Sequence, residues 1–299
     1  MTMATTTDTL SQKAYCILYN PLSATGQGEM KAHALDGFLS DGHVEYRSLL
    51  DIPDKRVFLE ELPDEITPVL TGGDGTISRF INDLDGQVPA RDILYFPAGS
   101  GNDFLKDLGK SADTPPFLLN PYLTDLPRIH FAGQSRVFLN GVGYGIDGYV
   151  CAEGTRKRAK TGKPINYTAV AVKGLVYAYK RTTATVTVDG KTMSFRHVWM
   201  TPTMKGRFFG GGMMCAPAQD RMNPNRTVSL MVMRATSKIR TLLLFPSIFK
   251  GEHVRDEKIV SMFPGHMIHV KFDRPTALQI DGEVYEGIEE YTVKTDNDA

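Results

Sequence analysis

The sequence has few cysteines, a single tryptophan and no long apolar run. Three cysteines, Cys16, Cys151 and Cys215, lie far apart among 299 residues. Their spacing and odd number exclude a disulfide framework and favour a reducing compartment, so we expect a cytoplasmic protein. No apolar stretch reaches the roughly 20 residues that a membrane-spanning helix needs. The start of the chain is rich in threonine and lacks basic and apolar segments, so we expect no signal peptide.

The chain also lacks an excess of charge of either sign. Its 34 Lys and Arg residues balance 34 Asp and Glu residues, which argues against nucleic acid as a partner. The seven histidines are scattered and no Cys/His group has zinc spacing, which excludes structural zinc. No Walker A motif, G-x-x-x-x-G-K-S/T, occurs. With 41% hydrophobic and 23% charged residues, the chain is globular and long enough for two domains.

The most informative segment is Thr71-Gly72-Gly73-Asp74-Gly75-Thr76, which directly follows a short apolar stretch over 66–70. Glycines let backbone N–H groups approach an anion, and the start of a following helix favours negative charge. Such a helix is predicted over 77–84, where apolar residues recur at i, i+3, i+4 and i+7. Alone, a Gly-Asp-Gly segment is more often an ordinary turn.

Two further turns repeat this design. Segment 97–103 follows an apolar strand at 93–96, and segment 20–28 follows a strand at 15–19. Because turns after parallel strands meet at the carboxyl edge of an open α/β sheet, we expect the three turns to lie close together. Together they favour a site for the phosphates of a nucleotide.

The pattern of elements predicts an α/β domain with a parallel, Rossmann-like sheet over 12–125, followed by a β-rich domain over 126–295. A proline-rich stretch, 114–127, marks the boundary. In the first domain we expect strands at 15–19, 44–49, 66–70 and 93–96, and helices at 29–39, 55–62, 77–84 and 103–108. In the second we expect strands at 136–142, 184–188, 195–200, 227–234, 267–272 and 290–294, a hairpin turn at Asp189-Gly190, and helices at 166–179 and 237–249.

These residues resemble a known family. Asn20-Pro21-Leu22-Ser23, Gly72–Thr76 and Gly99–Asp103 are similar to the three nucleotide-binding signatures of the diacylglycerol kinase catalytic family, in particular its soluble bacterial lipid kinases. The resemblance continues in the family's order through Gly143–Gly148, Gly210–Pro217 and Ile280–Glu283. Gly72–Thr76 alone is shared with NAD kinases and phosphofructokinases, whereas Asn102-Asp103 and Asp281-Gly282-Glu283 favour the lipid kinases.

The resemblance implies a β-sandwich in the second domain and an ATP-dependent, Mg²⁺-dependent kinase that phosphorylates a hydroxyl of diacylglycerol or a related lipid alcohol. Such an enzyme would associate peripherally with a membrane surface. It implies that Asp281 is the general base, assisted by Glu283, and that Asp74 is catalytic and, with Asp103, binds magnesium. The expected nucleotide-binding residues are Asn20, Pro21, Ser23, Gly26, Ser48, Gly72, Gly73, Asp74, Gly75, Thr76, Gly99, Ser100, Gly101, Asn102 and Asp103.

Several of these segments have simpler interpretations. Asn102 and Asp103 could be a helix N-cap, and 280–283 could be an ordinary hairpin turn. Gly143–Gly148 spells G-x-G-x-x-G, but a basic run at 155–163 follows it rather than an apolar helix, which disfavours a dinucleotide site. That basic run is typical of a solvated loop and could also meet a nucleotide or anionic lipid.

Other features bear on substrate and metal. Segment 237–249 favours core packing, with docking on a bilayer as the alternative. After Asp220, soluble bacterial members commonly continue into an Asp-Gly pair that contributes to a structural magnesium site, whereas this chain has Arg221 to Thr227. We therefore expect a catalytic but no structural magnesium. Ala24 also replaces a usual glycine. The rival functions are an NAD kinase and a regulator that binds nucleotide or lipid without turnover, and whether the chain forms a homodimer is left open.

Overall fold

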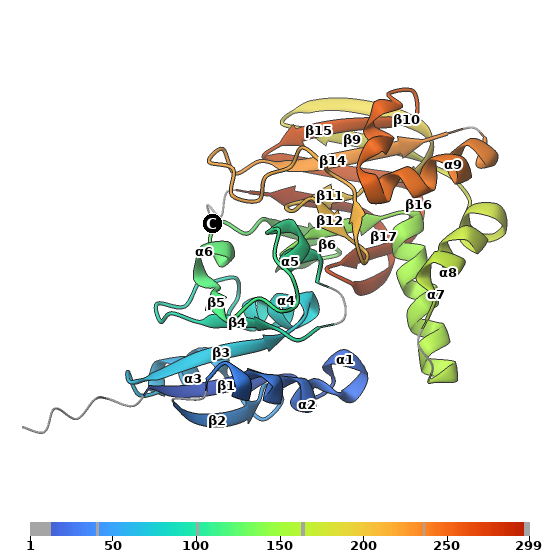
Figure 1. Ribbon diagram of the computed structural model, residues 1–299. Coiled ribbons are helices and arrows are strands. Elements are labelled where there is room, and N and C mark those ends of the chain that lie inside the picture. Colours follow the sequence, from blue (N-terminus) through green and yellow to red (C-terminus); the bar gives the residue numbers. More distant parts are fainter. Residues whose placement is uncertain (1–12, 40–41, 100–101, 163–164, 236, 296–299) are drawn as a thin grey trace, which may run out of the picture.

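The computed structural model describes residues 13–39, 42–99, 102–162, 165–235 and 237–295. Its strands gather into two main sheets, one from the first part of the chain and one from the second, which lie one above the other in Figure 1. No helix among the residues described here is both long and apolar enough to cross a membrane.

The first sheet has five strands in the order β2-β1-β3-β4-β5. The first four are parallel, and the edge strand β5 pairs antiparallel with β4. The expected α/β domain is thus confirmed, although β5 was not predicted. Its strands are β1 (Ala14–Tyr19), β2 (His43–Ser48), β3 (Ile66–Gly72), β4 (Leu94–Pro97) and β5 (Phe117–Leu118). Its helices are α1 (Ser23–Gly26), α2 (Gly28–Ala32), the 3-10 helix η1 (His33–Gly37), α3 (Lys55–Glu61), α4 (Asp74–Asp83), α5 (Asp103–Asp107) and α6 (Asn120–Leu123).

Helices cover both faces of this sheet. Leu59 of α3 and Phe80 of α4 are buried in one apolar cluster with residues of β1, β3 and β4. Leu35 of η1 is buried in a second cluster with Ile17 and Val69, whose side chains lie on the opposite face. A strand with both faces covered is apolar along its whole length, which is why these strands read as continuous hydrophobic runs.

The second sheet closes on itself. Six of its strands follow one another in the order β16-β8-β11-β14-β10-β9, and β9 pairs again with β16. Strands β17, β6 and β7 extend it from β16, and β15 pairs with β14. This barrel-like arrangement confirms the expected β-rich, sandwich-like domain. Its strands are β6 (Arg128–Phe131), β7 (Gln134–Val137), β8 (Gly141–Tyr144), β9 (Thr182–Val188), β10 (Lys191–Met200), β11 (Thr203–Met204), β14 (Val228–Arg234), β15 (Val260–Gly265), β16 (Met267–Ile280) and β17 (Glu283–Lys294); β12 (Phe208–Phe209) and β13 (Met213–Met214) form a separate pair.

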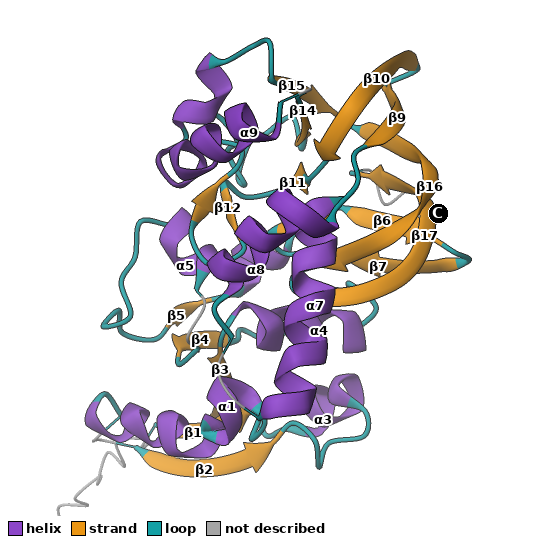
Figure 2. Ribbon diagram, turned by 90° about the vertical axis from the view of Figure 1, so that its right-hand side faces the viewer, coloured by secondary structure: helices purple, strands orange, loops and turns teal. Residues whose placement is uncertain are grey.

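Helical segments lie along one side of this barrel (Figure 2). They share an apolar cluster with the outer face of β10 and β14 that includes Ile146, Leu175, Trp199 and Met233. This cluster is separate from the interior of the barrel. The elements are α7 (Ile146–Thr161), α8 (Tyr167–Lys173), the π-helical turn η2 (Gly174–Ala178), α9 (Lys238–Leu244) and the 3-10 helices η3 (Phe245–Lys250) and η4 (Glu252–Arg255).

Helix α7 corrects one sequence-based prediction. The basic run expected to form a loop from Arg156 is helical to Thr161, and Gly162 ends the helix in the left-handed conformation. The run stays exposed, because a helix can carry charges on its solvent face without leaving any backbone group unpaired. A helix therefore does follow the G-x-G-x-x-G segment.

The glycines of that segment pack closely against neighbouring strands. A Cβ on Gly148 would lie 2.1 Å from the carbonyl oxygen of Ala277 in β16, and a Cβ on Gly145 would lie 2.5 Å from the carbonyl oxygen of Trp199 in β10. The glycines thus let α7 begin in direct contact with two strands of the barrel. This contact leaves no room for a pyrophosphate beside Gly145 and Gly148.

Several expected elements are also interrupted. The strand predicted over 136–142 is split into the end of β7 and the start of β8. The helices predicted over 29–39, 166–179 and 237–249 each change partway to a 3-10 or π turn. In the last case Pro246 provides the reason, because it has no N–H to continue the α-helical ladder.

Candidate active site

The turns after β3 and β4 meet at the carboxyl edge of the first sheet. Gly72 and Pro97 are paired at the ends of the two strands. The carbonyl oxygen of Gly72 accepts hydrogen bonds from the amides of Ala98 (2.9 Å) and Gly99 (3.0 Å). A Cβ on Gly99 would lie 2.3 Å from the Cα of Gly73, so only glycine allows this approach. The predicted residues Ser100 and Gly101 lie outside the described part of the chain.

The turn after β1 reaches the same edge, since Tyr19 pairs with Thr71. Its Asn20 is buried, and its side-chain oxygen accepts a hydrogen bond from the amide of Leu22. A Cβ on Gly28 would lie 2.0 Å from the carbonyl oxygen of Asn20 and 2.5 Å from Oγ of Ser23, so this turn folds tightly on itself. In this turn Pro21 and Ser23 are half-buried, and Gly26 is exposed with φ +85°. Ser48, at the end of β2, accepts a hydrogen bond from the amide of Leu50.

Asp74 joins the second turn to the third. It begins α4, and its carboxylate accepts hydrogen bonds from the amides of Asp103 (2.7 Å) and Phe104 (3.3 Å) at the start of α5. Asp74 therefore caps α5 from a different helix. Asn102 makes no capping hydrogen bond; its amide donates to the carbonyl of Gly99 (3.1 Å). Asn102 thus occupies the N-cap position of α5 without capping the helix through its side chain.

Asp281 lies in the turn between β16 and β17. Asp281 and Gly282 have φ angles of +46° and +91°, as a two-residue hairpin turn requires. The carboxylate of Asp281 accepts hydrogen bonds from three consecutive backbone amides, those of Leu139 (2.6 Å), Asn140 (2.9 Å) and Gly141 (3.1 Å). The segment 280–283 is therefore a hairpin turn and also holds a carboxylate in a fixed position.

A cavity of about 630 Å³ brings Asp74, Asp103 and Asp281 into one wall. Its volume lies within the roughly 300–1,000 Å³ typical of small-molecule sites. Gly75 also lines it, and a Cβ there would meet nothing within 4 Å. Most of the remaining wall is apolar and comes from α7, α8, η2, η3, the β12–β13 pair and the barrel. These residues include Ile146, Val150, Ile165, Ala171, Leu175, Trp199, Met200, Phe209, Met213, Met233, Phe245 and Phe249.

The carboxyl groups in this wall have pKa values above their ordinary range. Burial, together with the negative charges of Asp103 and Asp281, raises the pKa of Asp74 to about 7. Burial also raises the pKa of Asp281, although the three backbone amides and the hydroxyl of Ser78 oppose it. Burial likewise raises the pKa of Asp103, although hydrogen bonds from the amides of Gly211 and Gly212 oppose this rise. Three carboxylates gathered out of water would be stabilised by a bound cation.

Asp147 is a fourth buried carboxylate of the cavity. It lies at the start of α7, is 8% exposed, and neither of its side-chain oxygens has a hydrogen-bond partner. Burial raises its pKa to about 7. A buried carboxylate without a side-chain partner is unusual in a folded protein, so Asp147 is a candidate contact for a polar group of a ligand.

Glu283 points elsewhere than the three aspartates. It forms ion pairs with Arg79 of α4 (3.1 Å) and with Arg136 of β7, and these guanidinium groups lower its pKa. The two arginines connect the first helix layer to the second sheet. Glu283 thus acts as a contact between the two halves of the chain, and the geometry gives it no direct path to the cavity wall.

The glycine turns fit a nucleotide. Two buried side-chain oxygens there, Oγ1 of Thr71 and Oδ1 of Asn102, have no hydrogen-bond partner, and Gly75 leaves open space. Among the described residues no group of three or more His, Cys, Asp or Glu side chains is arranged to hold a metal. Asp74 and Asp103 nevertheless fit magnesium in a kinase, because Mg²⁺ commonly takes one or two carboxylates plus substrate phosphates and waters.

Sequence reasoning missed two parts of the site. The backbone amides of 139–141 hold Asp281, and the side-chain oxygen of Gln279 beside it accepts a hydrogen bond from the amide of Gly282 (2.8 Å). Backbone amides have no sequence signature, and 139–141 was predicted to be part of a strand. The apolar wall was also missed, since its residues come from many elements that are far apart in the sequence.

Each half of the chain is similar to a known protein domain. Residues 14–123 match the diacylglycerol kinase catalytic domain, and residues 140–292 match the YegS C-terminal NAD kinase beta sandwich-like domain. The chain belongs to the diacylglycerol kinase family. The family identification made from the sequence is thus confirmed, and it includes the superfamily relation to NAD kinases.

The similarity of this diacylglycerol kinase family member to its relatives covers most of its length. It is 26% identical over 266 residues to a diacylglycerol kinase of Mycobacterium tuberculosis, covering 85% of this chain and 84% of the relative. A crystal structure of a diacylglycerol kinase from Bacillus anthracis matches with a TM-score of 0.60 at 17% identity, covering 95% of each chain. At that identity the structural likeness shows the fold.

Proposed function

We propose that this protein is an ATP-dependent lipid kinase that transfers the γ-phosphoryl group of ATP to a hydroxyl of diacylglycerol or a related lipid alcohol. The observation that carries the proposal is the cavity, whose wall combines Asp74, Asp103 and Asp281 with an extended apolar lining. A lipid alcohol has the same two parts, a hydroxyl head and an apolar tail. Membership of the diacylglycerol kinase family and the M. tuberculosis relative support the same substrate class.

Different residues of the site have different roles in phosphoryl transfer. Backbone N–H groups of the glycine turns bind the phosphates, and Asp74 and Asp103 would hold Mg²⁺, whose charge would neutralise that of the phosphates. Asp281 accepts the proton of the acceptor hydroxyl as general base, and burial, which raises its pKa, makes it a stronger base than an ordinary carboxylate. The apolar wall excludes water and orients the acceptor, with Asp147 available to a polar group near its head.

The apolar wall also weighs against an NAD kinase. NAD as the acceptor would bring a dinucleotide's phosphates, riboses and bases into the cavity, and these groups need polar partners. A regulator without turnover remains the rival from another class. It is disfavoured by the fixed position and raised pKa of Asp281, which a protein that only binds its ligands does not need.

A transfer assay with γ-labelled ATP tests the proposal. The acceptors are dispersed diacylglycerol, monoacylglycerol, a sphingoid base, a polyprenol and NAD, each with magnesium. We expect label in at least one lipid and none in NADP. Label in NADP alone would establish an NAD kinase. Binding of ATP by calorimetry with no transfer to any acceptor would establish the regulator.

Membrane contact is expected at α9. Its Ile239 and Leu243, one helical turn apart, are 72% and 76% exposed, and neighbouring Phe249 is exposed while also lining the cavity. Lys238 and Lys250 flank them with positive charge that anionic lipids attract. The prediction of core packing for 237–249 thus holds for only one face of this segment.

The double variant Ile239→Glu/Leu243→Glu tests this contact. We expect lipid phosphorylation in anionic vesicles to fall about tenfold or more, since two apolar side chains no longer enter the bilayer. ATP binding should stay unchanged. The matched control is Val57→Glu, an exposed apolar residue of α3 on the other sheet. Equal vesicle activity of the double variant and the control would remove α9 from the membrane contact.

A further inference from the structure

A buried carboxylate and two arginines lie where the two halves of the chain meet. Asp107 of α5 accepts hydrogen bonds from Nε of Arg207 (2.8 Å) and Nε of Arg221 (2.6 Å), one on each carboxylate oxygen. The side chains of Asp107 and Arg221 are 3% and 4% exposed. Both arginines come from the second half of the chain and Asp107 from the first, so the cluster joins the two.

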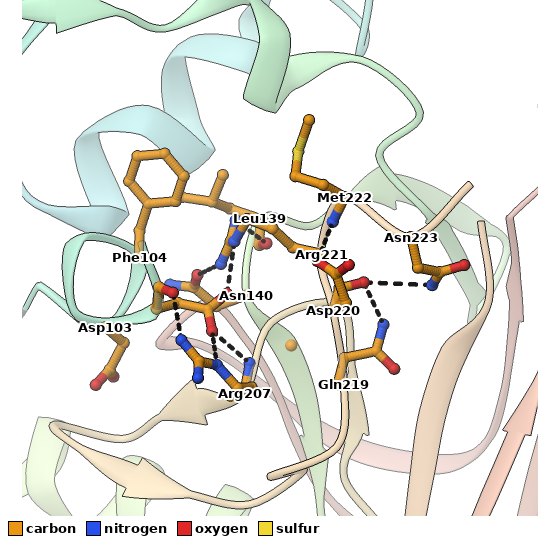
Figure 3. Close-up of polar contacts among 12 residues, drawn as sticks. Asp103, Phe104, Leu139, Asn140, Arg207, Gln219, Asp220, Arg221, Met222 and Asn223 are labelled. Atoms are coloured by element: carbon orange, nitrogen blue, oxygen red, sulfur yellow. Dashed lines mark hydrogen bonds and ion pairs between the residues drawn. The ribbon is translucent and has the colours of Figure 1, made fainter. Parts of the chain in front are cut away.

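Arg221 uses its remaining donors on a third segment. Its guanidinium donates to Oδ1 of Asn140 (2.8 Å) and to the carbonyl of Leu139 (3.3 Å), and it stacks 4.7 Å from the centre of the Phe104 ring. Figure 3 shows Arg221 among these side chains. A planar guanidinium with a fixed fork of donors can make all these contacts at once, which an ammonium cannot.

The residues that Arg221 contacts are those that set the geometry of the candidate active site. The amides of 139–141 hold the carboxylate of Asp281, while Arg221 holds the Leu139 carbonyl and the Asn140 side chain of the same segment. At its other end, Arg221 holds Asp107, which lies one turn beyond Asp103 on α5. Arg221 thus lies between the cradle of Asp281 and the helix that carries Asp103.

The junction around Asp107 and Arg221 does not fit the structural magnesium ion that soluble bacterial members of the family commonly bind. Both oxygens of Asp107 already accept hydrogen bonds from guanidinium groups, and Oδ1 of Asp220 accepts one from the amide of Met222 (2.9 Å). Lys205 is also buried there, and burial together with the charge of Arg221 lowers its pKa. A divalent cation here would meet positive charge where it needs free oxygens.

We propose that Arg221 is a positioning residue, and that its guanidinium supplies the fixed positive charge of this junction without a bound metal ion. It has two separable effects. Its charge compensates buried Asp107, which stabilises the fold. Its fork of donors fixes the 139–141 segment and thereby the carboxylate of Asp281; this second effect rests on the proposed kinase function.

Stability measurements test the first effect. We expect Arg221→Ala to lower the melting temperature by roughly 10 °C, because it leaves Asp107 buried with only Arg207 as charged partner. Arg221→Lys should recover most of that loss, since it restores the charge. The control Arg240→Ala, which breaks an exposed ion pair with Asp256, should shift the melting temperature by only about 2 °C. A melting temperature of Arg221→Ala equal to that of the control would overturn the first effect.

Magnesium titration without nucleotide tests the absence of a metal at the junction. Any magnesium-induced shift in melting temperature should be the same in the native protein and in Asp107→Asn, because the ion would bind elsewhere. A shift present in the native protein and lost in Asp107→Asn would place magnesium at Asp107 and overturn the proposal. These stability readouts hold whether or not the protein is a kinase.

Kinetics tests the second effect. Arg221→Lys keeps the charge but loses the fork, so we expect a kcat at least about tenfold below the native value with KM for ATP within about twofold. A native kcat in Arg221→Lys, with its stability recovered, would reduce Arg221 to a structural role. If no lipid is phosphorylated even by the native protein, the proposed function fails while the stability results remain valid.

Discussion

Replacing Asp281 by asparagine is expected to lower kcat by roughly 100- to 10,000-fold, the usual contribution of a general base. An amide cannot accept the proton of the acceptor hydroxyl. ATP binding should persist, because the glycine turns that bind phosphate belong to the first sheet and not to the β16–β17 hairpin. Transfer of label from ATP to lipid measures the first effect, and calorimetric titration with ATP measures the second.

The chain contains a matched control for this substitution. Asp189 lies in the β9–β10 hairpin in the same Asp-Gly turn, with φ +46° followed by +82° at Gly190. Its carboxylate also accepts hydrogen bonds from two consecutive backbone amides, those of His266 and Met267. Asp189→Asn should therefore show the effect of the same change in an exposed Asp-Gly turn while leaving turnover unchanged. Native turnover in Asp281→Asn would remove Asp281 as the base.

Replacing Asp147 by asparagine is expected to stabilise the protein at neutral pH. A rise of the Asp147 pKa from 3.8 to about 7 corresponds to about 4 kcal/mol for burying the charged form. An asparagine without partners would still leave a buried amide unsatisfied, at roughly 1–3 kcal/mol. The charge is the larger effect, so we expect a net gain of about 2 kcal/mol in the free energy of unfolding, measured with urea at pH 8.

The pH dependence provides a second measurement on the same variant. Because the folded-state pKa of Asp147 lies above its unfolded value, the folded state binds the extra proton between about pH 4 and 7. Its stabilising contribution is complete below about pH 4 and lost as the pH rises through 7. Between these pH values the free energy of unfolding therefore falls as the pH rises. Asp147→Asn should reduce the slope of this fall by the contribution of one proton. The exposed control Asp113→Asn should leave the slope unchanged, and a destabilised Asp147→Asn would mean that the carboxylate has a stabilising partner.

The sequence was sufficient for those features that depend on local patterns. Apolar runs with glycine turns identified four strands of the first sheet, since strands covered on both faces are hydrophobic throughout. The Asp189-Gly190 and Asp281-Gly282 turns were also legible, because few residues tolerate two successive positive φ angles. The family motifs placed Asp74, Asp103 and Asp281 together before any distance was known.

Local patterns failed where one segment depends on another. The run over 156–161 is helical because α7 begins in contact with β10 and β16, a contact that no local spacing records. The predicted strand over 136–142 breaks because its central amides bind the distant carboxylate of Asp281. Asp281 lies at least 140 positions from these amides in the sequence.

The sequence by itself determined the family, the α/β and β-rich halves and the three acidic residues, because glycine turns and alternating apolar patterns act over a few neighbouring residues. Only the tertiary structure decided that Asp74 caps α5, that Glu283 pairs with Arg79 and Arg136, and that Arg221 neutralises Asp107. The physical reason is that burial and charge compensation depend on which side chains share a space, and chain folding alone brings those side chains together.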